Sequence, residues 1–427
     1  MPTTTARNWR GATSSRLILL LGLAAASPAP RAVIDPPAAH YPTQIIASEA
    51  AGGRQSFLVA LGNTAFSSPL LYGAAAREAG ITCNACHTNG HINRAFLVPG
   101  ASAHPGSFDA TSAAFNPRAD NGVHDPLDIP SLRGVRLTGP WGRDGRIGSL
   151  REFARHVIVD EFAGPEPAPL ILDALVAYLN EQEFLPNPRI DGFGRLTATA
   201  SEAERRGQAL FETPFAGLGG QACASCHIPG ALFTDGRVHD VGSGGRFKTP
   251  TLLNSADSAP YFHDGRAADF AAVVAHFDQR FGLGLTGRDR GDLVAYLQAI
   301  GAAEDAEEAP SFAREMGELA IWTDVLATTI ADDDRTLTRF VAETVAADLD
   351  RLARAWPRGD AAHGTARPDR TRKPVDFSAL RQGILGVAAH ADAGRPEAAL
   401  AALRAYFDLA ESMAANYPRR ALDGPAQ

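Results

Sequence analysis

The stretch Cys83-Asn84-Ala85-Cys86-His87 returns later in the chain as Cys223-Ala224-Ser225-Cys226-His227, and these two copies decide the fold. In the pattern Cys-x-x-Cys-His, two thiols bond to the vinyl groups of a haem and the adjacent imidazole binds its iron from one face. A Cys-x-x-Cys pair alone would also suit a redox dithiol or half of a zinc site. Here both copies carry the histidine, and together they use all four cysteines of the chain. The sequence therefore predicts two covalently bound haem c groups and no disulfide.

The surroundings of the two motifs repeat as well. The lead-in from Gly62 to Pro69 matches the lead-in from Gly207 to Pro214. Behind the motifs, a second match keeps a constant spacing of 120 residues: Pro130 with Pro250, Asp144-Gly145-Arg146 with Asp264-Gly265-Arg266, and His156 with His276. A lead helix, a haem loop and a closing helix form the layout of a small helical cytochrome c. We expect two such domains in tandem, over residues 31–195 and 196–303.

The first half differs by 20 additional residues between its haem motif and Pro130, and this longer loop contains His91, His104 and His124. Such an insertion is normally exposed and often functional.

Residues 304–427 predict a third, haem-free domain, because no cysteine remains in them. Apolar side chains recur there at helical spacing, as in Leu337, Val341, Val345, Leu349, Leu352 and Trp356. Three further stripes follow the same rule, and residues 357–374 interrupt them with proline and arginine, as a linker would. These stripes predict a four-helix bundle, with a docking surface for a partner as the alternative. The expected fold class is thus all-α.

The first 30 residues have the features of an export signal. Three arginines precede an apolar run from Leu17 to Ala26, and small residues follow. A membrane anchor is the alternative, but ten residues are too few to span a bilayer. We expect a cleaved signal, a periplasmic location and no stable membrane span. The net charge of −8 argues against nucleic-acid binding, which needs a basic face.

With these motifs in place, residues 45–300 resemble the bacterial di-haem cytochrome c peroxidases, including their MauG-type branch. The resemblance rests on the two haem motifs and on two further segments, Phe247-Lys248-Thr249-Pro250-Thr251-Leu252 and Pro260-Tyr261-Phe262-His263-Asp264-Gly265-Arg266. It implies that hydrogen peroxide is reduced at the first haem. Electrons would come through the second haem from an external donor, such as a small cytochrome c or a cupredoxin.

The proximal iron ligands predicted from the motifs are His87 and His227. The resemblance places a Met or Tyr ligand of the second haem at Phe277, which cannot ligate iron, and the three methionines all lie outside the mature haem halves. His276 next to it and its counterpart His156 remain as candidate ligands, or as surface or propionate-bonding histidines. For the distal face of the first haem, the resemblance points to His124 and then His104, with a solvated loop histidine as the alternative.

The resemblance also assigns an acid–base residue, an inter-haem tryptophan and a calcium ion. Glu161 is the candidate that moves a proton between the peroxide oxygens, against the alternative of a solvated carboxylate. The usual tryptophan position holds Arg143, and Trp141 lies two residues earlier, either between the haems or in the core. Asp128, with the backbone carbonyls of Ser258 and Pro260, is the implied calcium site.

Arg146 and Arg266 both follow an Asp-Gly pair. A guanidinium suits bidentate contact with a haem propionate, whereas an ordinary Asp–Arg surface pair is the alternative. The leading functional hypothesis is a peroxidase. A MauG-type oxidase of a protein or small molecule, and a non-catalytic di-haem electron carrier with two six-coordinate irons, remain as the other two.

Overall fold

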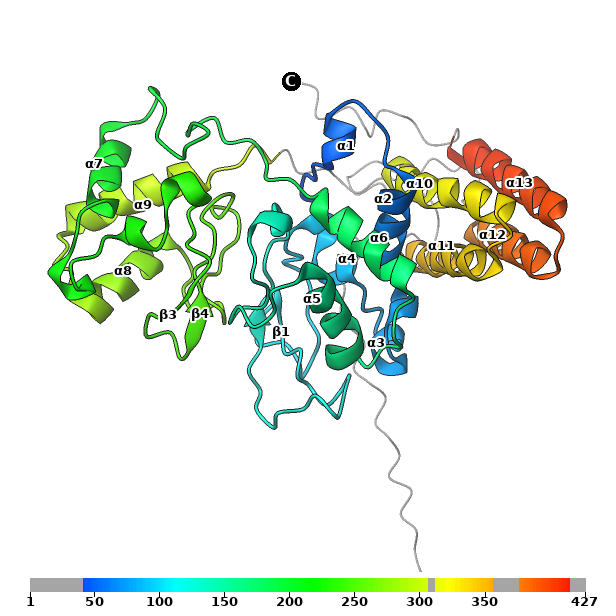
Figure 1. Ribbon diagram of the computed structural model, residues 1–427, viewed down its shortest axis with the longest axis horizontal. Helices are drawn as coiled ribbons and strands as arrows, with labels where there is room; N and C mark the ends of the chain where they lie inside the picture. The colour runs from blue at the N-terminus through cyan, green and yellow to red at the C-terminus, as the bar shows by residue number, and fades with distance from the viewer. Residues whose placement is uncertain (1–40, 306–311, 356–375, 415–427) are drawn as a thin grey trace, which may run out of the picture.

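The computed structural model describes residues 41–305, 312–355 and 376–414, and it is mostly helical with little sheet. The expected export signal, Trp356 and the linker at 357–374 lie outside the described residues. Figure 1 shows three groups of helices in a row, with the first haem domain in the middle. The prediction of an all-α chain needs one correction, because each haem domain also contains one short antiparallel strand pair.

The first domain is built around two long helices, α2 and α6. Its helices are α1 (Ala47–Ala50), α2 (Phe57–Phe66), α3 (Ala74–Glu78), α4 (Cys83–Cys86), α5 (Leu150–His156) and α6 (Pro169–Asn180). Single turns lie at Pro69–Leu71, Thr88–Gly90 and Val135–Leu137, and a π-helical turn follows α5 at Val157–Glu161. Strands β1 (Ser107–Phe108) and β2 (Leu127–Asp128) pair inside the additional loop.

The second domain repeats this plan with fewer elements. It contains α7 (Glu202–Phe211), α8 (Phe270–Phe281), α9 (Gly287–Gly301), the strand pair β3 (Val238–Asp240) and β4 (Arg246–Lys248), and turns at Ala216–Leu218, Cys223–Ser225 and Pro229–Ala231. Ser201 and Glu204 form a capping box that starts α7, which satisfies backbone donors at the helix end.

The same helix crossing holds each haem domain together. A Cβ atom on Gly62 would lie 1.9 Å from the carbonyl oxygen of Ala174, and a Cβ atom on Gly207 would lie 2.0 Å from that of Asp292. Only glycine therefore allows α2 to approach α6, and α7 to approach α9, this closely. One turn later Phe66 packs on Tyr178 and Phe211 packs on Tyr296, with ring centroids 5.3 and 5.1 Å apart.

The turns that carry Asp-Gly-Arg are also equivalent. Trp141 bridges to Ile147 as Tyr261 bridges to Ala267. The indole N–H of Trp141 donates to the carbonyl of Val135 at 3.1 Å, and the hydroxyl of Tyr261 donates to that of Ser255 at 3.0 Å. Every one of these pairs keeps the 120-residue spacing, so the sequence repeat is a structural repeat.

Four helices follow the second domain: α10 (Phe312–Ala331), α11 (Arg335–Ala355), α12 (Phe377–Asp392) and α13 (Pro396–Ala414). Each packs on the next and α13 returns to α10, which closes a four-helix bundle. The described members of the expected stripe, from Leu337 to Leu352, are buried.

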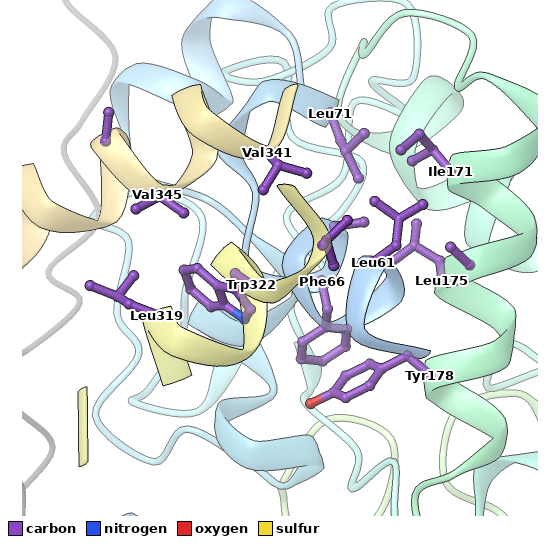
Figure 2. Close-up of a cluster of buried hydrophobic side chains, with 14 of the residues drawn as sticks. Leu61, Phe66, Leu71, Ile171, Leu175, Tyr178, Leu319, Trp322, Val341 and Val345 are labelled. Atoms are coloured by element: carbon purple, nitrogen blue, oxygen red, sulfur yellow. The ribbon is translucent and has the colours of Figure 1, made fainter. Parts of the chain in front are cut away.

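The bundle shares its hydrophobic core with the first haem domain, whereas the second domain has a separate core. Figure 2 shows Leu319 and Trp322 of α10 and Val341 and Val345 of α11 beside Phe66 of α2. None of the helices within these described ranges is long and apolar enough to cross a membrane.

Candidate haem sites

The first attachment motif forms a single helical turn. Thr82 starts α4, because its hydroxyl accepts the backbone N–H of Ala85 at 2.9 Å. Cys83 and Cys86 are the first and last residues of α4, and His87 follows directly. The Nδ1 atom of His87 lies 2.9 Å from the carbonyl oxygen of Pro130. Because a carbonyl only accepts, Nδ1 carries the proton and Nε2 keeps its lone pair for a metal.

The second motif reaches the same result with different contacts. The hydroxyl of Ser225 accepts the backbone N–H of Ala222 at 3.0 Å and fixes the turn that begins at Cys223. His227 places its Nδ1 atom 2.9 Å from the carbonyl oxygen of Phe233. Both imidazoles are therefore held in the tautomer that presents Nε2.

Burial sets the protonation of both motifs. It raises the pKa of the Cys83 and Cys223 thiols to about 11, and it lowers the pKa of His87 to about 4. The pKa of His227 is lowered for the same reason. A neutral imidazole with a fixed tautomer is the form that ligates iron, so this donor set fits two haem c groups.

Glu161 lies at the end of the π-helical turn, a helix type that is frequent at functional sites. Its side chain is 15% exposed, and its Oε1 atom is 3.3 Å from the guanidinium of Arg146 and 3.6 Å from Nε2 of His156. Burial raises the pKa of Glu161, although His156 and Arg146 oppose the shift. Burial raises the pKa of Cys86, and the charges of Cys83 and Glu161 add to this shift. The candidate acid–base group thus belongs to the surroundings of the first motif.

The two candidate histidine ligands have protein partners. His156 places Nδ1 2.9 Å from Asp160 and Nε2 3.2 Å from Arg146. His276 places Nε2 2.8 Å from the carbonyl of Val241. Phe277, the next residue on α8, packs beside it.

Arg146 and Arg266 contact the aspartates of their own Asp-Gly-Arg turns. The Arg146–Asp144 distance is 3.0 Å and the shortest Arg266–Asp264 distance is 2.5 Å. Both guanidiniums are about two-fifths exposed. Trp141 is half-buried against the core of the first domain, where the Val135 carbonyl holds its indole.

The loop histidines have different partners. His124 is exposed, with Nδ1 3.7 Å from the carboxylate of Asp109. His104 instead reaches the second domain, where its Nε2 atom lies 3.4 Å from the carbonyl oxygen of Asp264.

Asp128 lies at the contact between the haem domains. Its backbone N–H donates to the carbonyl of His263 at 2.8 Å, and the backbone N–H of Lys248 donates to that of Arg143 at the same distance. The 120-residue repeat pairs Asp128 with Lys248 and Arg143 with His263, so each domain gives the other the same hydrogen bond. The two domains are therefore related by an approximate two-fold axis. Arg143 also contacts the carboxylate and the carbonyl of Asp128. Burial raises the pKa of Asp128 to about 7.

Sequence reasoning missed two groups near the haem motifs. The hydroxyl of Tyr72 lies 3.0 Å from the sulfur of Cys83. In the second domain Cys226, Asp235 and His239 lie within one cluster, with Nε2 of His239 2.8 Å from the Asp235 carboxylate. Alignment of the two halves would have singled out Tyr72, because the stretch between Pro214 and Cys223 contains no tyrosine.

Comparison with known proteins supports the resemblance found in the sequence. Residues 201–342 match the family model of di-haem cytochrome c peroxidase. The hydrazine synthase subunit gamma of Kuenenia stuttgartiensis is 27% identical, over 40% of this chain and 63% of that protein. The methylamine utilization proteins MauG of Methylorubrum extorquens and Methylophilus methylotrophus are 32% and 29% identical, over 36% and 44% of their lengths. The chain thus spans less than two thirds of each of these relatives.

Two solved structures are similar at lower identity. The Kuenenia stuttgartiensis hydrazine synthase matches 70% of this chain and 99% of its own, at 21% identity and a TM-score of 0.41. A MauG-like protein associated with microbial copper homeostasis matches 59% of this chain and 91% of its own, at 17% identity and a TM-score of 0.40. The family model and the curated relatives agree with the duplicated haem motifs: over part of its length, this chain is similar to the di-haem cytochrome c peroxidases and MauG proteins.

Proposed function

We propose that this protein is an exported di-haem c peroxidase of the periplasm. It would reduce hydrogen peroxide at the first haem with electrons relayed through the second. The carrying observation is an asymmetry between the two equivalent helices: the first ends in the buried carboxyl of Glu161, whereas the 120-residue repeat gives Phe281 at that position in the second. The expected export signal at residues 1–30 supports the location.

The bound haem would supply an iron that takes up peroxide and passes electrons to it. The protein would supply the proton path. Glu161 has a raised pKa and so would be suited to move a proton between the two oxygens of peroxide. His156 and Arg146 fix the carboxyl from one side. The balanced reaction consumes two electrons and two protons for each peroxide and releases two waters.

The second site would relay electrons. The phenylalanines Phe277 and Phe281 pack along α8 at a centroid distance of 5.9 Å, and they offer no acid or base to peroxide. An external donor such as a small cytochrome c or a cupredoxin would deliver electrons one at a time to this half.

A calcium ion at Asp128 is part of the proposal, and the approximate two-fold axis supports it. The 120-residue repeat pairs Asp128 with Lys248. It also pairs the carbonyls of Thr138 and Pro140 in the first domain with those of Ser258 and Pro260 in the second. The Lys248 ammonium donates to both carbonyls of the first domain, at 2.6 Å to Pro140. At the other position a carboxylate replaces the ammonium. Its oxygens and the two carbonyls of the second domain would form the hard donor set that calcium prefers, beside the Arg143 guanidinium that also contacts Asp128.

The substitution Glu161→Gln tests the peroxidase. We expect peroxide turnover with a reduced donor to fall by about 10²- to 10⁴-fold, the range for loss of a positioned acid–base group, with two haems still attached. Glu166→Gln is the matched control, because this carboxylate is 60% exposed and pairs with Arg155. Equal turnover in both variants would contradict the assignment of Glu161.

The MauG relatives motivate a second candidate, oxidation of a protein or small molecule. Electron spin resonance of the oxidised and half-reduced protein separates the classes. A high-spin haem that reacts with peroxide is required by both enzymatic proposals, and donor oxidation in step with peroxide consumption distinguishes the peroxidase from the oxidase. Two low-spin, six-coordinate haems in every redox state would indicate an electron carrier.

A further inference from the structure

Tyr72 is a buried phenol in contact with the first haem attachment site. It follows the turn at Pro69–Leu71, is 1% exposed, and places its hydroxyl 3.0 Å from the sulfur of Cys83. When Cys83 is bonded to a haem vinyl group its sulfur has no proton, so the phenol must be the donor. Burial raises the pKa of Tyr72 well above its ordinary value, which keeps the donor protonated.

The surrounding backbone fixes this phenol. Its ring packs edge-on against Phe162 at 5.5 Å between centroids, and the N–H of Gly73 donates to the carbonyl of Phe162 at 3.0 Å. A Cβ atom on Gly164 would lie 2.1 Å from the carbonyl of Leu71, so the two segments touch through glycine. Arg77 donates to the carbonyl of Tyr72 at 3.1 Å. These contacts hold the phenol with its oxygen beside the sulfur of Cys83.

The second haem motif has no equivalent. The stretch from Pro69 to Cys83 is five residues longer than the stretch from Pro214 to Cys223, and the shorter stretch contains Phe215 as its one aromatic residue. The two domains share the helix crossing, the Asp-Gly-Arg turn and the histidine tautomer. They differ in the phenol donor, which only the first domain has at its attachment cysteine.

We infer that Tyr72 raises the reduction potential of the first haem, relative to the second, by donating a hydrogen bond to the thioether sulfur of Cys83. The positive end of the O–H dipole draws electron density from the sulfur and, through it, from the haem ring. This favours the reduced iron, and hydrogen bonds in the outer shell are a recognised means of setting haem potentials. Tyr72 is thus a positioning residue for electron transfer and requires only that haem is attached at Cys83 and Cys86.

A spectroelectrochemical titration of the full-length, haem-loaded protein tests this inference without peroxide. In Tyr72→Phe we expect one of the two midpoint potentials to fall while the other stays at its wild-type value. Tyr178→Phe is the matched control, since this buried tyrosine of the same domain bonds to Gln44 instead. It should leave both potentials unchanged.

Unchanged potentials in Tyr72→Phe, or equal shifts of both, would overturn the inference. If Tyr72→Phe loses its haem, a second test is to incorporate fluorotyrosine at position 72. Fluorination makes the phenol more acidic and therefore a stronger hydrogen-bond donor. One potential should then rise, and no change would again overturn the inference. Loss of peroxide turnover in Glu161→Gln is measured separately, so failure of either proposal leaves the other standing.

Discussion

The lead helices α2 and α7 each pack on the closing helix of their own haem domain, but α2 is mostly buried and α7 is mostly exposed. Both cross a closing helix at a glycine and place a phenylalanine on a tyrosine one turn later. Eight of the ten residues of α2 are buried, however, against two of ten in α7. The inner face of each helix is fixed by the haem domain, and the outer face depends on what covers it.

Equivalent residues show the difference one position at a time. Asn63 of α2 accepts the indole N–H of Trp322 from the bundle at 3.3 Å, whereas its counterpart Gln208 bonds to Glu212 of its own helix at the exposed surface. The bundle also reaches the first haem loop, where Arg314 donates to Asn89 at 2.9 Å. The C-terminal helices are therefore a second layer of the first haem domain, and no described part of the chain covers the second domain in this way.

Filling the crossing glycines should give the largest effect. In Gly62→Leu or Gly207→Leu, the side chain would overlap a backbone carbonyl, since a Cβ atom alone lies within 2.0 Å of one. Overpacking of this kind costs about 1–3 kcal/mol and occasionally more, and here backbone has to move. We expect each variant to lose the haem of its own domain, as counted by a haemochrome assay and located by peptide mapping.

The comparison becomes sharper with circular dichroism. Gly62→Leu should also lose helix signal from the bundle, because α2 is its base, whereas Gly207→Leu should keep it. Gly291→Ala is the control on α9, where no atom lies within 4 Å of the added Cβ. Equal helix loss in the two leucine variants would show that the bundle folds independently of α2.

Lys248 and its equivalent Asp128, at the contact between the domains, should give an intermediate effect. Burial lowers the pKa of Lys248 to about 8, from an ordinary value of 10.5. Between these values the unfolded chain binds more protons than the folded protein, so stability should rise as the pH rises from about 8 to 10.5. The contribution is at most about 3 kcal/mol, and less where solvent screens the ammonium. Urea unfolding of wild type and Lys248→Met should reveal the rise in wild type alone.

Calcium should act at the other position. Added calcium is expected to raise the melting temperature of wild type, and a chelator should reverse the gain, because a ligand of the folded state stabilises it. Asp128→Asn should abolish this response and leave the pH effect of Lys248 in place. If Asp128→Asn still responded to calcium, the ion would have to bind at another site.

Much of this architecture could be predicted from the chain alone. The Cys-x-x-Cys-His copies, the 120-residue spacing and the apolar stripes depend on short-range patterns, and the helices built from them follow the expected plan. The sequence of α2 also predicts that other elements cover it, because its first turns, Phe57-Leu58-Val59-Ala60-Leu61, have no polar face. By contrast, α7 begins with the polar run Glu202-Ala203-Glu204-Arg205-Arg206.

The contacts of the site residues could not be predicted in this way. His104 lies at the second domain and Tyr72 at Cys83 because loops of different lengths fold over the haem motif. Such contacts depend on the path of a loop, which a spacing argument does not define. The partner of Glu161 was equally hidden, because the π-helical turn shifts the register of the side chains after His156.

The smallest expected effect comes from the hydroxyl pair of Ser68 and Thr344, which joins the first haem domain to the bundle. Ser68 lies 2.7 Å from the hydroxyl of Thr344, which itself donates to the carbonyl of Phe340. Ser68→Ala should therefore lower the free energy of unfolding by about 1 kcal/mol, the usual value of a buried hydrogen bond. Its counterpart Thr213 bonds within its own exposed helix end, so Thr213→Ala should stay within about 0.5 kcal/mol of wild type.

A double-mutant cycle of Ser68→Ala with Thr344→Val, measured by urea unfolding, assigns the loss to the pair itself. Because the two residues come from different layers, a coupling energy near the full loss means that the bundle is held to α2 in the folded protein. A coupling energy of zero, with equal losses in Ser68→Ala and Thr213→Ala, would mean that the two lead helices have the same surroundings in solution and that the second layer is not fixed to the first.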